Sequence, residues 1–403
     1  MRSLPLVATF LIATAASAQD PELAALHATL ATLQSHAKET TIENSGARSE
    51  LTVAKHQLRD WIEKRIGSLK DLQHTEALSS QINNKLKAVS VPGSGDDQNL
   101  LGSVGEVRFS SEAGFLIVTT GVGVLCQYDE SAYAYKNENG RWQRIWESEQ
   151  NDYSPKKYAP QYIVAVRVWQ AWEGGHQAGP PFIMTLGNHW GCASSWHPVF
   201  YRVWRVDPSG SKLLIDDSEV AFLRTDTYIV GSMVQDRTTK NAPVDVLIEF
   251  TQRSIDAGVH SREAVRHLLI EGDRAHRVDP VALSPRDFVD EWLTRPWDES
   301  ARWSASASLQ QWHRKLHADW VGGEFSYPTM HCQTPDLWQV TFEPHNPKKN
   351  FEPEPEVNFL IRWSPPYHFA MVDVSDKAWT RCNQKDPEAD AWRTLFNTQE
   401  WRW

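Results

Sequence analysis

The sequence predicts an α+β protein of several domains, because its residue pattern changes three times along the chain. An apolar stripe with helical spacing runs through residues 20–90, short β-rich runs follow to about residue 283, and helical spacing then returns before further strands. We expect an N-terminal helical hairpin or coiled coil, a central antiparallel β domain that is propeller-like or a sandwich, and a small C-terminal α+β domain. The expected boundaries are 1–18 for a leader, then 19–96, 97–283 and 284–403.

The first eighteen residues have the features of a secretory signal peptide. Met1-Arg2 gives a basic start, an apolar run follows from Leu4 to Ala16, and Ala16-Ser17-Ala18 has the small-x-small pattern of a cleavage site. The apolar run is shorter than the roughly 20 residues that a membrane-spanning helix needs. We therefore expect cleavage before Gln19, no membrane span in the mature chain, and a secreted or periplasmic location.

The composition excludes several classes of function. The 403 residues carry a formal charge of −10 without a long block of one sign, so neither a nucleic-acid partner nor a polybasic lipid-binding patch is expected. Neither Gly121-Val-Gly123 nor Val321-Gly-Gly323 opens into a phosphate-binding loop. We expect no cofactor.

The four cysteines favour structural disulfides. An even number in an exported chain is typical of disulfide bonding, and chain order favours Cys126–Cys192 and Cys332–Cys382, each within one expected domain. No C-x-x-C is present, which argues against a zinc ribbon or a thioredoxin-like redox site.

The helical segment has a long apolar seam with a break at Asn44-Ser45-Gly46. Two roles fit this seam equally well. The helices could self-associate as a coiled coil, or they could dock on the domain behind them. The seam residues are Leu23, Leu26, Leu30, Leu33, Ala37, Leu51, Ala54, Leu58, Trp61, Ile62, Ile66, Leu69, Leu72, Leu78, Ile82, Leu86 and Val89.

The central region contains three β-hairpin patterns about 67 residues apart, at 133–146, 200–215 and 267–278, each with a glycine in its turn. Further strands are expected between them. Regular units of this kind fit either a small propeller or a sandwich with long connections.

The C-terminal region predicts helices near Phe288–Leu293 and Leu309–Trp320, followed by strands at 337–342, 357–363 and 368–374. Of the 19 tryptophans, 11 lie after residue 290. Tryptophan stacks on sugars but also fills small cores, and the helical spacing here favours the core.

The candidate ligand-binding residues come from two loops. The loop at residues 187–198 collects His189, Trp190, Trp196 and His197, and a Gly-rich loop one strand earlier adds His176. The histidine spacing does not match a zinc motif, so no metal is expected. The surroundings of Cys192 and Ser194 match no cysteine-protease or serine-hydrolase signature, and the catalytic residues stay unknown.

Three adjacent carboxylate pairs, Asp129–Glu130, Asp216–Asp217 and Asp290–Glu291, are the other chemical candidates, and surface solvation is the simpler interpretation of each pair.

We therefore expect an exported binding or scaffolding protein at the cell envelope, with self-association through the helices and a glycan or envelope component as its expected partners. The alternative is a secreted hydrolase that acts on carbohydrate. The sequence does not decide whether the protein is an enzyme.

Overall fold

The computed structural model describes most of the chain between residues 20 and 390. The described ranges are 20–36, 47–69, 71–91, 100–125, 127–151, 160–173, 176–189, 196–222, 230–235, 243–258, 261–271, 273–278, 282–317, 322–326, 328–346, 349–364 and 368–390. The expected leader lies outside these ranges, so its cleavage stays a prediction. Within the described ranges, no helix is both long and apolar enough to cross a membrane.

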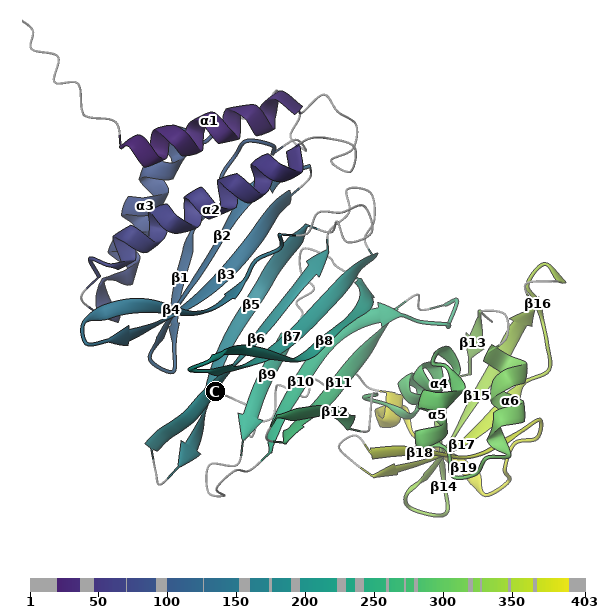
Figure 1. The fold of residues 1–403 in the computed structure, drawn as a ribbon. Helices are drawn as coiled ribbons and strands as arrows, with labels where there is room; N and C mark the ends of the chain where they lie inside the picture. The colour runs from purple at the N-terminus through teal and green to yellow at the C-terminus, as the bar shows by residue number, and fades with distance from the viewer. Residues whose placement is uncertain are drawn as a thin grey trace, which may run out of the picture.

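Three helices at the N-terminal end lie together over one face of a sheet (Figure 1). They are α1 (Pro21–Ser35), α2 (Ala47–Ile66) and α3 (Thr75–Val89), with a short 3-10 turn, η3 (Leu72–His74), before α3. Helix α1 begins at a side-chain cap, in which Asp20 accepts a hydrogen bond from the Glu22 amide at 3.2 Å. The apolar stripes of all three helices share one core with the sheet. The expected two-helix hairpin and coiled coil are therefore not confirmed.

The sheet beneath the helices is antiparallel and has four strands in sequence order. They are β1 (Arg108–Glu112), β2 (Phe115–Val124), β3 (Gln127–Glu138) and β4 (Arg141–Ser148). Strand β2 is buried along its whole length. Leu116 and Val118 face the helices, whereas Phe115 and Ile117 belong to a core on the opposite face, as the alternation of a β-strand requires.

The second sheet has eight described strands in the order β12-β11-β10-β8-β7-β6-β5, with β9 paired to β10. They are β5 (Gln161–Glu173), β6 (His176–His189), β7 (Trp196–Asp207), β8 (Gly210–Phe222), β9 (Val230–Gln235), β10 (Val244–Arg253), β11 (Ser261–Glu271) and β12 (Arg274–Val278). The sheet curls so that β9 contacts β5. Its strands share a separate apolar core that includes Met184, Tyr201 and Val246.

The two sheets pack face to face through a third core, in which Ile117 and Ala134 meet Ile183 and Phe200. Figure 1 shows the resulting order of layers, with helices first, then the four-stranded sheet, then the eight-stranded sheet. The three expected hairpins are present as β3–β4, β7–β8 and β11–β12. Face-to-face packing of sheets occurs in propellers as well as in sandwiches, so the antiparallel β domain is confirmed and the choice between these two arrangements stays a prediction.

The C-terminal part is a seven-stranded sheet with helices packed on it (Figure 1). Its helical elements are α4 (Pro285–Thr294), α5 (Trp297–Ser300), η4 (Ala301–Trp303), α6 (Leu309–His317) and η6 (Pro387–Asp390). Its strands are β13 (Gly323–Phe325), β14 (Met330–Cys332), β15 (Leu337–Asn346), β16 (Glu352–Pro353), β17 (Val357–Ser364), β18 (His368–Ser375) and β19 (Cys382–Lys385). This part confirms the expected mixture of helices and antiparallel strands.

Four of the described tryptophans in the C-terminal part belong to its core. Trp292, Trp303, Trp338 and Trp363 are each at most 7% exposed and share one cluster. A disulfide joins Cys332 to Cys382 between β14 and β19, as chain order predicted. The other expected pair, Cys126–Cys192, lies outside the described residues and stays a prediction.

Buried carboxylates tie the layers together. Asp129 on β3 accepts a hydrogen bond from Lys55 Nζ on α2 at 2.8 Å and another from the Gln161 amide on β5 at 3.1 Å. Its neighbour Glu130 accepts from the Ile163 amide at 2.7 Å and from Arg108 at 3.0 Å. Burial raises the pKa of Glu130 to about 7, although Arg108 opposes that change.

A second set of buried charges joins the eight-stranded sheet to the C-terminal part. Arg266 on β11 contacts Glu219 on β8 at 2.7 Å and Glu291 on α4 at 3.1 Å. Arg262 forms ion pairs with Asp290 and Glu291, and Arg295 contacts Glu219 and Glu291. Burial acts to raise the pKa of Glu219, but Arg266 and Arg295 outweigh it and hold that pKa at about 2.

We predict that Arg266→Met destabilises the protein by about 3–5 kcal/mol, because Glu219 and Glu291 would stay buried with one fewer cation. Urea unfolding followed by circular dichroism measures this loss. The matched control is Arg314→Met on the exposed side of α6, which should change stability by less than about 0.5 kcal/mol. Equal, small effects of the two substitutions would contradict a role for Arg266 in holding the two parts together.

We predict that the stability of the wild-type protein falls relative to Glu130→Gln as the pH rises from 4 to 8. The pKa of Glu130 is raised from 4.5 to about 7 in the folded state, so the folded state binds this proton more tightly than the unfolded state. The contribution is therefore complete below the unfolded pKa and is lost as the pH rises through about 7. The expected loss is about 2–4 kcal/mol.

Urea unfolding of both proteins at several pH values between 4 and 8 measures this difference. Other titrating groups are common to both proteins and cancel in the comparison. Parallel stability curves across this range would show that Glu130 has an ordinary pKa.

Candidate functional site

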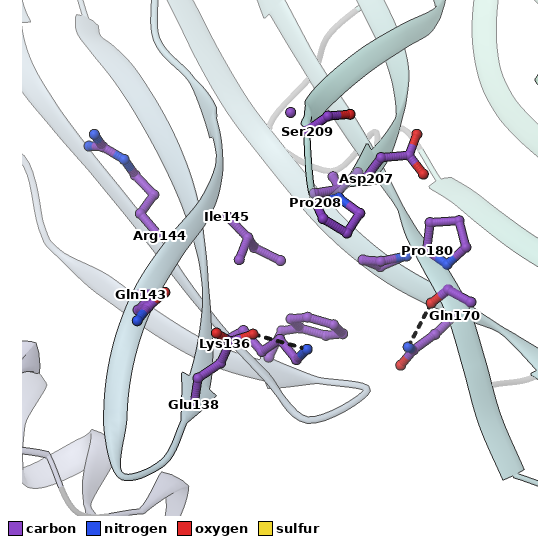
Figure 2. A pocket seen from close by; sticks show the side chains of 15 residues that line it. Lys136, Glu138, Gln143, Arg144, Ile145, Gln170, Pro180, Asp207, Pro208 and Ser209 are labelled. Carbon is purple, nitrogen blue, oxygen red and sulfur yellow. Dashed lines mark hydrogen bonds and ion pairs between the residues drawn. The ribbon is translucent and has the colours of Figure 1, made fainter.

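A groove of about 750 Å³ opens where the two packed sheets diverge at their hairpin ends (Figure 2). One wall is the end of the β3–β4 hairpin, and the other comes from β5, β6 and the β7–β8 turn. The lining residues are Phe115, Lys136, Glu138, Gln143, Arg144, Ile145, Gln170, Gly179, Pro180, Pro181, Val206, Asp207, Pro208, Ser209 and Gly210.

The strand pairing becomes irregular on both walls of this groove. The β3–β4 ladder shifts register between Ala134 and Tyr135, which leaves Ile145 as the extra residue of a β-bulge. The β5–β6 ladder shifts between Gln170 and Trp172, opposite the segment that contains Pro180. Proline has no amide hydrogen and interrupts a ladder, and bulges re-aim side chains and are frequent beside functional sites. The groove is therefore a local departure from regular sheet structure.

The β3–β4 wall carries charged and amide side chains. Lys136 and Glu138 lie on the same face of β3 and form an ion pair at 3.2 Å. Gln143 stands opposite Lys136 in the ladder and shares that face. The hairpin closes with Asn139 and Gly140, both with positive φ (55° and 81°), which is the geometry of a two-residue hairpin turn.

The facing wall is less charged. Gln170 Nε2 donates a hydrogen bond to the Gly179 carbonyl at 2.9 Å, which holds its side chain along the wall (Figure 2). Asp207 forms an ion pair with Arg205 at 3.3 Å, and Pro208 and Ser209 form the exposed turn beside it.

Apolar side chains contribute the deeper part of the lining. Phe115 and Val206 are buried, and both belong to the core between the two sheets. The groove thus combines an apolar base with walls that carry both signs of charge and side-chain amides. Such a surface suits a ligand that has apolar surface as well as hydrogen-bonding groups.

The groove brings two carboxylates, Glu138 and Asp207, to opposite walls (Figure 2). Each has a cationic partner, Lys136 or Arg205. Among the residues that the structure describes, no group of three or more histidine, cysteine or acidic side chains is placed to hold a metal ion.

Of the expected ligand-binding residues, the three whose side chains the structure describes, His189, Trp196 and His197, do not line this groove. His189 lies at the end of β6, with its ring 4.9 Å from that of Phe200. His197 is buried on β7, and Trp196 begins that strand partly buried. Trp190 and the side chain of His176 lie outside the described residues. The binding role of these five residues stays a prediction.

Strand register places the two expected loops at opposite ends of β6. His176 pairs with Glu173 next to the β5–β6 turn, whereas Gln161 pairs with His189 at the far end of the same ladder. The groove lies near the first of these ends, beside Gly179 and Pro180.

Sequence reasoning missed the groove because its residues come from three hairpins. The proline pair at 180–181, inside an otherwise β-rich run, was the one available signal.

The surface interpretation of the acidic pairs is wrong for two of the three. Asp129, Glu130, Asp290 and Glu291 are at most 6% exposed. The buried cations Lys55 and Arg262 hold three of them, and the partly exposed Arg108 pairs with Glu130. Only Asp216–Asp217 is exposed, with about half of each side chain open to solvent. The sequence held a signal for the burial of Asp290 and Glu291. Arg262 and Arg266 lie on one face of β11, and arginines among the apolar residues of a strand need buried anions.

No protein-family model and no curated protein matches this chain. Solved structures with some likeness include an α-L-arabinanase of Penicillium chrysogenum complexed with arabinobiose, at 8% identity and a TM-score of 0.26. That match covers 66% of this chain and 65% of the arabinanase. This chain thus spans slightly less than two thirds of that enzyme's length.

Two further structures have a similar, low likeness. An exo-1,5-α-L-arabinanase from a bovine ruminal metagenomic library is 9% identical, with 70% of this chain and 85% of that chain covered and a TM-score of 0.22. A lectin of Aleuria aurantia in complex with α-methyl-L-fucoside is 11% identical, with 66% and 76% covered and a TM-score of 0.22. At these scores the likeness assigns neither a fold family nor a function to this chain.

Proposed function

We propose that this protein is a non-catalytic binding protein of the cell envelope and that its ligand lies in the groove between the β3–β4 hairpin and the tips of β5–β8. The observation that carries the proposal is the groove itself, because two ladders lose their regular pairing at one place and open a hollow of about 750 Å³. That volume is in the range of small-molecule and peptide sites.

The charges of the groove support binding more than chemistry. Glu138 and Asp207 already have cationic partners, so neither stands alone as an activated acid or base. The proposed location outside the cytoplasm is supported by the Cys332–Cys382 disulfide, because such bonds persist in oxidising compartments. It also follows the leader-like pattern of residues 1–18.

We predict that Ser209→Trp lowers binding at least tenfold, because an indole at this turn would occupy the mouth of the groove. The probe is a mixed array of immobilised oligosaccharides and short peptides, and fluorescence polarisation of each hit then gives the affinity. Ser111→Trp, on the exposed part of β1 and away from the groove, is the control and should bind like wild type. Equal binding by the two variants would place the ligand site elsewhere on the molecule.

A second candidate function is hydrolysis of a carbohydrate, and one observation favours it. Glu138 and Asp207 lie on opposite walls of the same groove, and a glycosidase needs two carboxylates that flank the scissile bond (Figure 2). A hydrolase would release reducing ends from soluble oligosaccharides, and Glu138→Gln and Asp207→Asn would each abolish that release. If wild type releases none while the array shows binding, the hydrolase is rejected and the binding protein stands.

A further inference from the structure

The groove runs along an open edge of the four-stranded sheet. Among the described strands, β4 is the last strand of its sheet and pairs only with β3. Three consecutive residues of β4, Gln143, Arg144 and Ile145, line the groove. Because successive side chains of a strand point to opposite faces, three consecutive lining residues indicate that the strand meets the groove with its edge.

The hairpin geometry shows which backbone groups of β4 point outward. The two-residue turn makes Glu138 and Arg141 a hydrogen-bonded pair, and pairs then alternate along an antiparallel ladder. Trp142 opposite Asn137, and Arg144 opposite Tyr135, are therefore non-hydrogen-bonded pairs. The amide and carbonyl groups of Trp142 and Arg144 point away from β3, toward the open edge.

The side chains of these two residues leave that edge clear. Arg144 reaches Glu63 on α2 at 3.0 Å, and Trp142 Nε1 donates to the Leu69 carbonyl at 2.9 Å, so both lie on the helix side of the sheet. Figure 2 shows the Arg144 side chain turned away from Pro180 and Gln170 across the groove. The part of Arg144 that borders the groove is thus its main chain.

Resting on the proposed function, we propose that the ligand is an extended polypeptide segment that adds to β4 as a fifth strand. A peptide presents amides and carbonyls at the spacing of Trp142 and Arg144, which sugar hydroxyls do not reproduce. The facing Pro180-Pro181 segment offers no amide hydrogen and so cannot form a regular ladder, which leaves β4 as the strand that pairs with the peptide. The bulge at Ile145 ends regular pairing, which limits the paired segment to a few residues.

The test is a pair of substitutions at one residue. Arg144→Pro removes the outward amide hydrogen without removing a bond to β3, and proline is tolerated at such edge positions. Arg144→Ala keeps the amide hydrogen and reports the loss of the side chain alone. With a heptapeptide selected on the wild-type protein from a random library, we expect Arg144→Pro to bind at least tenfold more weakly than Arg144→Ala. Thermal unfolding of both variants checks that they fold alike.

The peptide itself supplies a second measurement that needs no variant. Methylating its backbone nitrogens one at a time should weaken binding at every second position, because only alternate amides of an added strand face β4. Hydrogen exchange should also slow at the amides of Trp142 and Arg144 when the peptide is bound.

The outcomes separate this inference from the proposed function. If only oligosaccharides bind, and Ser209→Trp weakens them, the groove stands as a binding site and the added strand is rejected. If peptides bind but methylation shows no alternation and Arg144→Pro matches Arg144→Ala, side chains alone hold the peptide and the added strand is again rejected. If neither class binds, the proposed function fails and the inference fails with it.

Discussion

The double burial of strand β2 is the constraint on which the rest of the structure depends. Leu116 and Val118 fill the core beneath the helices, while Phe115 and Ile117 fill the core against the second sheet, so one short strand joins two apolar layers. A polar side chain on the neighbouring strand must then find its partner inside the protein. Asp129 and Glu130 on β3 do so with Lys55, with Arg108 and with the backbone of β5, which fixes the layers against one another.

This layering also explains why the groove lies where it does. The core between the sheets reaches Phe115 and Val206, but the β3–β4 and β7–β8 hairpins extend beyond it. Past that point the described lining includes polar side chains such as Lys136, Gln143 and Gln170. The junction with the C-terminal part has a different character, because Arg266 is buried there and paired with Glu219 and Glu291.

Residue spacing within short segments predicted the helices and strands better than it predicted how they pack against one another. The hairpins were predictable because turn residues such as Asn139-Gly140 and alternating β-rich runs act over a few residues. The packing of the helical seam on β1–β4 was not predictable, because the apolar seam of a helix does not show which apolar surface will cover it. The ion pairs of Arg266 with Glu219 and Glu291 join residues 47 and 25 positions apart, so the arginines of β11 signal buried anions without showing which ones. The groove escaped sequence reasoning for the same reason.

An open strand edge is a hazard that proteins limit with charges, bulges and neighbouring cover, because any exposed edge can pair with another sheet. Strand β4 has each of these features. Arg141 places a positive charge beside the hairpin turn, Ile145 interrupts the regular pairing, and the wall of Pro180 and Pro181 stands across a groove of limited volume. In the proposed complex, a single extended chain occupies that space. The same features that protect the edge against aggregation therefore leave it open to one slender peptide.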